Sequence, residues 1–406
     1  MIKLPFEIIR LLWNCGNNRI EHLDGFAKEF CNATFDIVST SPFVIQANNT
    51  NILLTRDEND PSIENYQYAV LTNKKPRKSD IIKGNIISIR WLKHPNFKNL
   101  QPNEIVASWR GKFLYKKENI QESILGLRAP QLGAIYAFMS KAQIHHGRNI
   151  IVMPTGTGKT ETMLSILIAN QCPKVLITVP SDALRDQISN KFLTLGILPE
   201  FGIVASDCNY PIVGVVKEGM DYNGWYTLIE KSNVIITTMP LITNCESAII
   251  DLFKEKISHL FVDEAHHSEA KTWSEFIDSF NDEKVTLFTA TPFRNDNRRL
   301  RGEFIYNFSL KEAQSQGYYK PIKFIPIREY DLAKADKCIA EVAVNQLRSD
   351  LENEYDHILM ARCSTKQRAK EIMEVYQQYP DLNPVMVFSS MPNQKAILKD
   401  IKEKKA

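Results

Sequence analysis

The stretch Met153-Pro-Thr-Gly-Thr-Gly-Lys-Thr160 decides the fold that we expect for this chain. It follows a short apolar run at 150–153 and precedes an amphipathic run that reaches residue 169, which predicts a strand that turns into a helix. Gly156 and Gly158 allow backbone conformations in which consecutive N–H groups point at one anion. Lys159 adds a positive charge for the β- and γ-phosphates of a nucleotide, and the Thr160 hydroxyl is placed to bind Mg²⁺.

This stretch therefore predicts a P-loop with ATP and Mg²⁺ as its ligands. One position departs from the general pattern, which has glycine where this chain has Met153. The alternative is a glycine-rich turn beside a helix that happens to carry a lysine. The predicted nucleotide-binding residues of the loop are Thr155, Gly156, Thr157, Gly158, Lys159 and Thr160.

Length and composition are those of an ordinary globular protein. A chain of 406 residues predicts two to three domains. The 50 basic residues are offset by 47 acidic ones, so the net charge of +3 does not by itself indicate a nucleic-acid partner. The seven cysteines show no CxxC spacing, which argues against a zinc site and for reduced thiols. No apolar run approaches the roughly 20 residues that cross a bilayer, so we expect a cytoplasmic protein without membrane contact.

Residues 1–118 are predicted to form an N-terminal accessory domain of the α+β class. Apolar residues recur with a helical period at 6–12 and 20–30. Alternating or β-branched runs at 35–38, 43–46, 51–55 and 86–91 read as short strands between turn residues. The basic run at 74–78 is typical of a solvated loop.

From residue 119 onward the pattern alternates between strand and helix, which predicts an α/β domain at 119–325. Buried strands of this kind form a parallel sheet with helices on both faces, and ligands bind at the carboxyl ends of the strands. The predicted helices include 182–193 and 241–254. The predicted strands are 150–153, 175–179, 201–205, 234–238, 260–262 and 285–288.

A second α/β unit is predicted at 336–406, after a link around Tyr318-Tyr-Lys-Pro321. It contains helices at 334–353 and 366–378, a helix that starts near 393, and strands at 357–361 and 385–388. About 70 residues are fewer than the roughly 100 that a complete lobe needs, so we expect this α/β lobe to be incomplete.

A second nucleotide signal is Leu260-Phe-Val-Asp-Glu-Ala-His266. Its apolar strand delivers two adjacent carboxylates to the carboxyl end, where Asp263 can hold the metal and its water shell and Glu264 can polarise an attacking water. We predict that Glu264, Lys159 and Asp263 are catalytic and that Thr160 and Asp263 bind the metal. The alternative for this segment alone is an exposed acidic turn.

Together, Asp263-Glu-Ala-His266 and Thr155-Gly-Thr-Gly-Lys-Thr160 resemble the DEAH-type superfamily 2 helicases and translocases. Further stretches agree in order. Thr289-Ala-Thr-Pro-Phe-Arg294 is similar to motif III, Val179-Pro-Ser-Asp-Ala-Leu-Arg-Asp-Gln187 to motif Ia, and Thr237-Thr-Met-Pro240 to motif Ib. The resemblance implies an ATP hydrolase that moves on nucleic acid. It also implies a RecA-like fold for the first α/β domain, 119–325, and an incomplete second RecA-like lobe at 336–406.

The resemblance also implies roles for residues outside the loop. Gln131, in Leu127-Arg-Ala-Pro-Gln131, sits where relatives read adenine; the alternative is an exposed helix residue. For His266, the implied contact is with motif III or the second lobe, and the alternative is a partly buried histidine at a strand end. The residues implied in nucleic-acid contact or coupling are Arg185, Thr237, Thr238, His266, Thr289 and Thr291.

Within the superfamily, the sequence is most similar to bacterial restriction and phage-defence helicases, through the Thr-Pro-Phe-Arg ending and the arginine-rich turn at 294–301. DNA is then a more natural partner than RNA, and a second polypeptide that completes the core, or a nuclease, is a further partner. No segment after residue 390 matches the second-lobe motif that supplies the positive charge for phosphoryl transfer. We therefore expect weak hydrolysis from this chain alone. The rival hypothesis is an ATP-gated regulatory or scaffolding subunit that binds nucleotide without unwinding.

Overall fold

The computed structural model describes residues 2–3, 10–15, 18–23, 34–47, 49–79, 88–93, 101–141, 144, 147–205, 207–267, 271–291, 300–320, 323–388, 391 and 394–402. The chain divides into two compact units, Met1–Lys320 and Pro321–Ala406. Each unit is described by itself below. None of the helices in the described ranges is both long and apolar enough to span a membrane.

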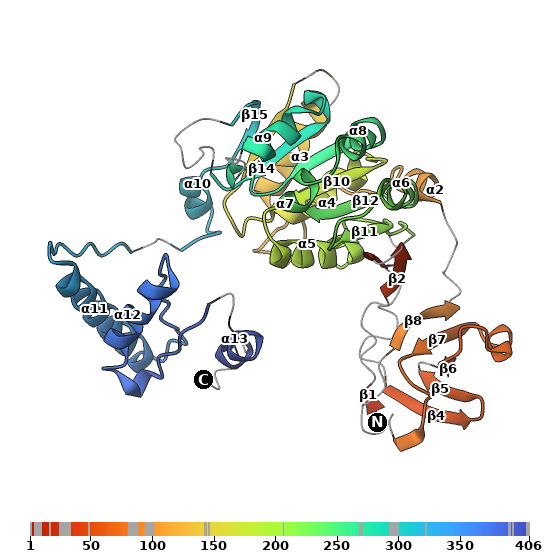
Figure 1. The fold of residues 1–406 in the computed structure, drawn as a ribbon, viewed down its shortest axis with the longest axis horizontal. Coiled ribbons are helices and arrows are strands. Elements are labelled where there is room, and N and C mark those ends of the chain that lie inside the picture. The colour runs from red at the N-terminus through yellow and green to blue at the C-terminus, as the bar shows by residue number, and fades with distance from the viewer. Residues whose placement is uncertain are drawn as a thin grey trace. The chain divides into compact units, whose positions relative to one another are not determined.

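The centre of the first unit is a parallel sheet, which confirms the predicted RecA-like α/β class. Seven neighbouring strands run parallel in the order β15-β9-β14-β13-β10-β12-β11 (Figure 1). Two further strands extend this sheet beyond β11 in antiparallel fashion. The parallel strands are β9 (Asn149–Val152), β10 (Val175–Val179), β11 (Val213–Val216), β12 (Val234–Thr238), β13 (His259–Val262), β14 (Val285–Thr289) and β15 (Glu303–Asn307).

Helices cover both faces of this sheet, so alternate residues of each strand enter two different cores. Ile151 and Ile177 pack with α2, α3, α4 and α5, whereas Ile150 and Leu176 pack with α6, α7, α8 and α9. Burial on both faces explains why these strands are continuous apolar runs. The helices are α2 (Pro102–Ser108), α3 (Ala129–Lys141), α4 (Lys159–Ala169), α5 (Asp182–Thr194), α6 (Tyr222–Lys231), α7 (Met239–Thr243), α8 (Ser247–Lys256) and α9 (Lys271–Asp278).

Capping residues set the ends of several of these helices. The Ser181 hydroxyl accepts a hydrogen bond from the Leu184 N–H and starts α5, and Asp221 does the same for α6 through the Gly224 N–H. At the other end of α6, the Lys174 ammonium donates to the carbonyls of Ile229, Glu230 and Ser232. A cation at this end satisfies carbonyls that have no partner inside the helix.

Two sequence predictions for this sheet are wrong. Residues 201–205 form turns with one isolated bridge, between Val204 and Phe113, because Gly202 takes a positive φ of 63° that an extended strand does not allow. The predicted helix at 241–254 is two helices, α7 and α8, because the backbone leaves the helical region at Glu246. The strands β11 and β15 were not predicted.

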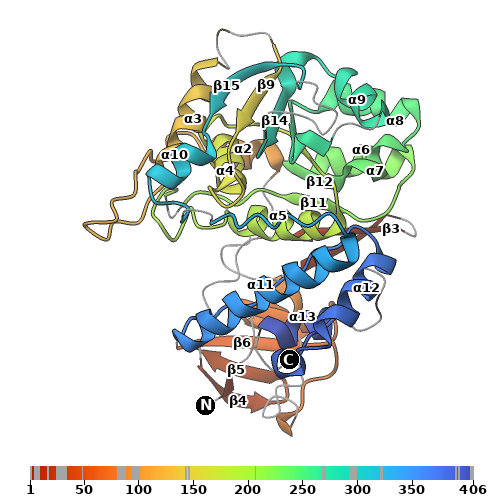
Figure 2. The ribbon, with the colours of Figure 1, turned by 90° about the vertical axis from the view of Figure 1, so that its left-hand side faces the viewer.

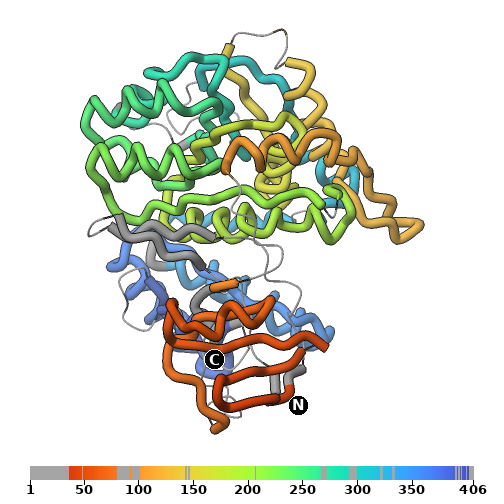
Figure 3. Tube along the Cα trace, turned by 90° about the vertical axis from the view of Figure 1, so that its right-hand side faces the viewer, coloured from red at the N-terminus to blue at the C-terminus, as the bar shows by residue number. Residues whose placement is uncertain are grey.

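A second sheet has the order β1-β4-β5-β6-β7-β8, with only β6 and β7 parallel (Figure 1). Figure 3 follows the chain through its central strands as a Cα trace in red and orange. It confirms the strands predicted at 35–38, 43–46 and 51–55 and, where described, the strand at 86–91. The strand β7 was not predicted. The strands are β1 (Ile2–Lys3), β4 (Thr34–Thr40), β5 (Phe43–Ala47), β6 (Thr50–Thr55), β7 (Tyr68–Thr72) and β8 (Ser88–Lys93).

The helices predicted at 6–12 and 20–30 are wrong where the structure describes them. Arg10–Cys15 and Asn18–Leu23 are strands β2 and β3, paired as a hairpin in which Cys15 lies opposite Asn18. Pairing of β3 with β11 outweighs the local helical period. Residues 6–9 and 24–30 lie outside the described ranges.

The second unit has three α-helices in its described part, as predicted (Figure 2), and a short 3₁₀ helix, Pro380–Leu382. The α-helices are α11 (Leu332–Glu352), α12 (Lys366–Tyr376) and α13 (Gln394–Lys402). The strands predicted at 357–361 and 385–388 are not formed, since these residues pair with no strand in the described chain. A strand needs a neighbouring strand for its backbone hydrogen bonds, and side chains such as Met360, 86% exposed, remain in solvent.

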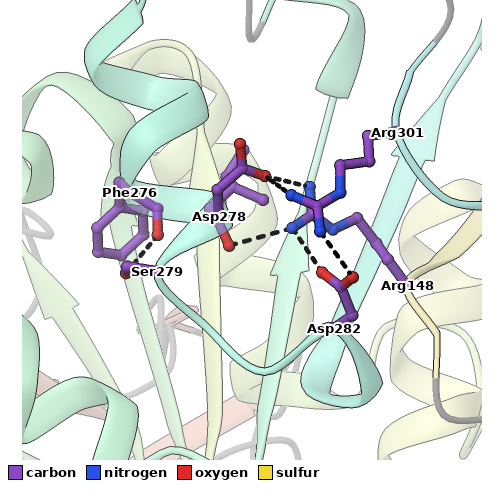
Figure 4. Close-up of polar contacts among 7 residues, drawn as sticks. Arg148, Phe276, Asp278, Ser279, Asp282 and Arg301 are labelled. Carbon is purple, nitrogen blue, oxygen red and sulfur yellow. Dashed lines mark hydrogen bonds and ion pairs between the residues drawn. The ribbon is translucent and has the colours of Figure 1, made fainter.

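An ion-pair cluster fixes the amino end of β9, the strand that leads into the predicted P-loop (Figure 4). Arg148 is 4% exposed and its guanidinium lies 2.9 Å from Asp278 Oδ1 and 2.8 Å from Asp282 Oδ1. Arg301 pairs with the same two carboxylates at 3.4 and 3.2 Å. The cluster therefore joins the start of β9 to the end of α9 and to the segment that enters β15.

Candidate active site

The loop between β9 and α4 has the backbone geometry of an anion cradle. Gly156 and Gly158 have positive φ values of 83° and 98°, and Gly158 is the N-cap of α4. The Thr157 hydroxyl donates to the Pro154 carbonyl at 2.6 Å and closes the turn. The helix N-terminus and the loop N–H groups together favour a phosphate at this place.

Two predicted catalytic side chains meet at the carboxyl end of the sheet. The Lys159 Nζ atom lies 2.6 Å from Glu264 Oε1, and neither side chain is more than 17% exposed. Lys159 follows β9 and Glu264 follows β13, with β14 between these strands. Glu264 has a φ of 48°, a left-handed conformation that costs a residue with a Cβ about 1 kcal/mol or more. The turn after β13 aims the carboxylate at the loop.

Asp263 lies beside this pair and is 7% exposed. Burial raises the pKa of its carboxyl to about 6, against the opposite effect of Lys159 and with a smaller contribution from Glu264. Its Oδ1 atom is buried and has no hydrogen-bond partner among the described residues. A buried carboxylate oxygen without a partner is costly, and a cation at this place would remove that cost.

The residues present fit Mg²⁺. Thr160, at the start of α4, supplies a hydroxyl, and Asp263 supplies the buried oxygen. Within the described ranges no group of three or more His, Cys, Asp or Glu side chains could hold a metal. A cation here would therefore complete its shell with phosphate oxygens and water, as Mg²⁺ commonly does.

His266 extends the pair towards the predicted motif III. Its Nδ1 atom lies 3.1 Å from the Thr289 hydroxyl and 3.4 Å from Glu264 Oε2. Thr289 in turn donates to the Thr291 carbonyl at 2.8 Å and accepts from the Thr291 N–H at 3.2 Å. The structure thus brings His266, Thr289 and Thr291 together beside Glu264. Residues 292–294 of the predicted motif, and most of the arginine-rich turn, lie outside the described ranges.

Gln131 is 2% exposed, so it is not the exposed helix residue of the alternative. Its Oε1 atom accepts from the Arg128 N–H at 2.8 Å, and its amide donates to the Gly158 carbonyl at 3.4 Å. The Arg128 guanidinium donates to the Gly156 carbonyl at 2.8 Å. The first turn of α3 and the residue before it are therefore bonded to the loop at two glycines, and adenine recognition by Gln131 stays a prediction.

The residues predicted to contact nucleic acid are more enclosed. Arg185 is 4% exposed and pairs with Asp182 at 2.5 Å and Asp186 at 3.1 Å. Thr237 and Thr238, at the end of β12, are 0% and 7% exposed. Their contact with nucleic acid stays a prediction, and it would involve backbone groups or a change of partners at Arg185.

Tyr318 and Tyr319 were missed as site residues, since the sequence placed them in a link. The Tyr318 hydroxyl donates to Glu118 Oε1 at 2.9 Å and accepts from the Ala129 N–H at 3.2 Å. The Arg128 guanidinium carbon lies 5.5 Å from the centre of the Tyr318 ring. The sequence signal that could have identified Tyr318 and Tyr319 is a pair of adjacent aromatic residues that follows a helix and a glycine.

Comparison with known proteins finds one family model that matches part of the chain, residues 124–294. This model is described as type III restriction enzyme, res subunit. No curated protein matches the chain.

Solved structures similar to this chain include three helicases or restriction enzymes, and the chain spans less than two thirds of each of them. For the UvsW helicase from bacteriophage T4 the identity is 15%, the coverage is 48% of this chain and 62% of that chain, and the TM-score is 0.31. The Hef helicase domain of Pyrococcus furiosus is 20% identical, with coverage of 62% of this chain and 54% of that chain and a TM-score of 0.33. The third structure is a nuclease-deletion mutant of the type ISP restriction-modification enzyme LlaGI in complex with a DNA substrate mimic. It is 16% identical, with coverage of 69% of this chain and 29% of that chain and a TM-score of 0.34.

Proposed function

We propose that this chain is an ATP-dependent superfamily 2 helicase or translocase, because residues 124–294 match the model of the type III restriction enzyme res subunit. One observation carries the proposal. The Lys159 ammonium and the Glu264 carboxylate, from the ends of two different strands, meet 2.6 Å apart beside the buried Asp263. Phosphoryl transfer to water needs this combination of a cation for the phosphates, a base for the water and a carboxylate for the metal.

Each residue of this site has its own proposed role in ATP binding or hydrolysis. The loop N–H groups and Lys159 bind the β- and γ-phosphates, and Lys159 leaves Glu264 when it does so. Glu264 then orients and polarises the attacking water. Thr160 and Asp263 hold Mg²⁺, which supplies positive charge to the phosphate oxygens when bound. Gln131 presents one donor and one acceptor to the adenine edge.

The hydrogen bond between His266 and Thr289 is the proposed route from hydrolysis to movement. His266 contacts Glu264 on one side and the predicted motif III on the other. A change at Glu264 during hydrolysis would therefore reach Thr289 and Thr291 through one side chain.

We further propose DNA as the nucleic acid and a nuclease, or a polypeptide that completes the core, as a partner. The matching family model is that of a restriction-enzyme subunit, which supports this choice. A role in restriction or phage defence would follow. The DEAH subtype rests on the Asp263-Glu-Ala-His266 sequence.

The first experiment measures ATP hydrolysis by the purified chain with single-stranded DNA, duplex DNA, RNA or no nucleic acid. We expect hydrolysis that DNA stimulates and that Lys159→Ala removes. Displacement of streptavidin from biotinylated DNA measures translocation, and release of one strand from a duplex measures unwinding. Binding should weaken steeply with salt, because contacts to phosphates release counterions.

The rival hypothesis is an outcome of the same experiment. ATP binding that is intact, with hydrolysis that neither DNA nor RNA changes, would reject the helicase and favour an ATP-gated regulatory subunit. Binding of nucleic acid that does not depend on salt would also contradict the proposal.

A further inference from the structure

The chain returns to the P-loop at the end of the first unit, through the turn that follows α10 (Leu310–Ser315). Gly317 has a φ of 78°, and the N–H groups of Tyr318 and Tyr319 both point at the Ala313 carbonyl, at 2.9 and 3.3 Å. These bonds close the helix end and fix the backbone from which both tyrosine side chains leave.

Tyr318 is held in place by several contacts. Its hydroxyl bridges Glu118 and the Ala129 N–H, and its ring packs against the Arg128 guanidinium and, edge to face, against Phe308. Burial, followed by the hydrogen bond to Glu118, raises the pKa of Tyr318. Tyr318 therefore anchors the turn to the segment that carries Arg128 and Gln131.

Tyr319 lies next to the loop itself. A Cβ atom placed on Gly156 would be 3.1 Å from the Tyr319 hydroxyl oxygen, so this hydroxyl lies against an exposed glycine of the P-loop. Among the described residues, the Tyr319 hydroxyl makes no hydrogen bond, although the side chain is partly buried. The Gly156 carbonyl already accepts a hydrogen bond from Arg128. The proton of the Tyr319 hydroxyl is therefore available for donation to a ligand at the edge of the loop.

We infer that Tyr319 is a nucleotide-binding residue whose hydroxyl donates a hydrogen bond to an oxygen of the phosphate chain. The inference rests on the proposed function, since it assumes that the loop binds ATP. A phosphate oxygen is charged, and hydrogen bonds to charged groups are the stronger ones. Tyr319 lies two residues before Pro321, where the second unit begins, so the contact also makes this segment part of the nucleotide site.

The test measures dissociation constants by calorimetry for ATP, ADP, inorganic triphosphate and adenosine. Tyr319→Phe removes only the hydroxyl, and we expect it to weaken ATP, ADP and inorganic triphosphate about tenfold. Adenosine should bind the variant and the parent equally. Tyr330→Phe is the matched control, because Tyr330 is 98% exposed, and its constants should equal those of the parent. Thermal unfolding without nucleotide checks that each variant is folded.

The outcomes separate this inference from the proposed function. Loss of ATP binding in Lys159→Ala with unchanged binding in Tyr319→Phe keeps the P-loop and overturns the role of Tyr319. A parent chain that does not bind ATP overturns both. A tenfold loss for adenosine as well as for ATP would assign Tyr319 to the nucleoside and also contradict the phosphate contact.

Discussion

The Nζ atom of Lys159 and the Oε1 atom of Glu264 are 2.6 Å apart, so the cation that should bind phosphate is paired with the base that should activate water. Both side chains are largely buried, which makes the pair stronger than a surface ion pair. In this structure each group neutralises the other. We expect ATP to compete with Glu264 for Lys159 and this competition to release Glu264 for catalysis.

The first prediction concerns the two ends of this pair. Lys159→Ala should abolish measurable ATP binding, because it removes the ammonium from the loop and leaves the buried Glu264 carboxylate uncompensated. Glu264→Gln should bind ATP at least as tightly as the parent, because a neutral amide competes less for Lys159. The same variant should hydrolyse ATP about 100-fold or more slowly.

Nucleotide titration and phosphate release, measured on both purified variants, check this prediction. If Lys159→Ala bound Mg·ATP as tightly as the parent, the assignment of the P-loop would be wrong. If Glu264→Gln hydrolysed ATP at the parent rate, the base would have to be another residue.

A second prediction uses the glycine at the start of α4. A Cβ on Gly158 would lie 2.0 Å from the Gln131 amide nitrogen, and the φ of 98° is one that residues with a Cβ rarely adopt. Gly158→Ala should therefore displace Gln131 or the loop and weaken ATP binding at least tenfold. Gly219→Ala is the control, because a Cβ there meets nothing within 4 Å. Equal affinities in the two variants would contradict the packing of Gln131 on the loop.

The strands and the two acidic residues of the site could be predicted because their information is local. A buried parallel strand is a continuous apolar run, so the strand before Asp263 and Glu264 was visible in the sequence. Their order in the sheet was not visible, because β14 inserts between β9 and β13 through contacts distant in sequence. Tyr318 was missed for the same reason, since its partner Glu118 lies 200 residues earlier.

The errors have an equally physical origin. The period of residues 10–12 and 20–23 suits a helix, but the sheet edge at β11 offers backbone partners that a local pattern does not record. At 357–361 the opposite holds, because an apolar run typical of a strand finds no neighbouring strand in the described chain. Strands depend on pairing more than helices do. The sequence pattern therefore missed the strands β2 and β3 and predicted a strand at 357–361 that does not form.

A third prediction concerns the ion-pair cluster at the start of β9. Arg148→Met should lower the free energy of unfolding by about 3 kcal/mol, because Arg148 is 4% exposed and its loss leaves two carboxylates close together. Arg301→Met should cost about 1 kcal/mol or less, since that side chain is 66% exposed. Urea denaturation measures both. Equal effects of the two changes would show that burial of Arg148 does not decide the strength of the cluster.

A fourth prediction concerns His259, at the start of β13 and far along the strand from the catalytic carboxylates. Burial, together with a smaller effect of the positive charge of Lys284, lowers the pKa of this histidine to about 4. Its ring nitrogens lie 3.3 Å from the Asn170 amide and 2.9 Å from the Ser258 hydroxyl, which are neutral partners. The folded chain therefore holds this imidazole neutral at a pH where the unfolded chain would protonate it.

The sign of the effect follows from proton binding. Between pH 6.5 and 4 the unfolded chain binds more protons at His259 than the folded chain, so stability falls as the pH falls through this window. Each pH unit contributes about 1.4 kcal/mol, which gives about 3 kcal/mol over the window. His259→Gln keeps polar atoms near Asn170 and Ser258 without a group that titrates. We expect the difference in unfolding free energy between parent and variant to change by about 3 kcal/mol in favour of the variant from pH 7 to pH 4. Urea denaturation of both chains at several pH values measures this difference. The contribution of the carboxylates is common to both chains and cancels. A difference that does not change with pH would show that His259 has the same pKa in the folded and unfolded states.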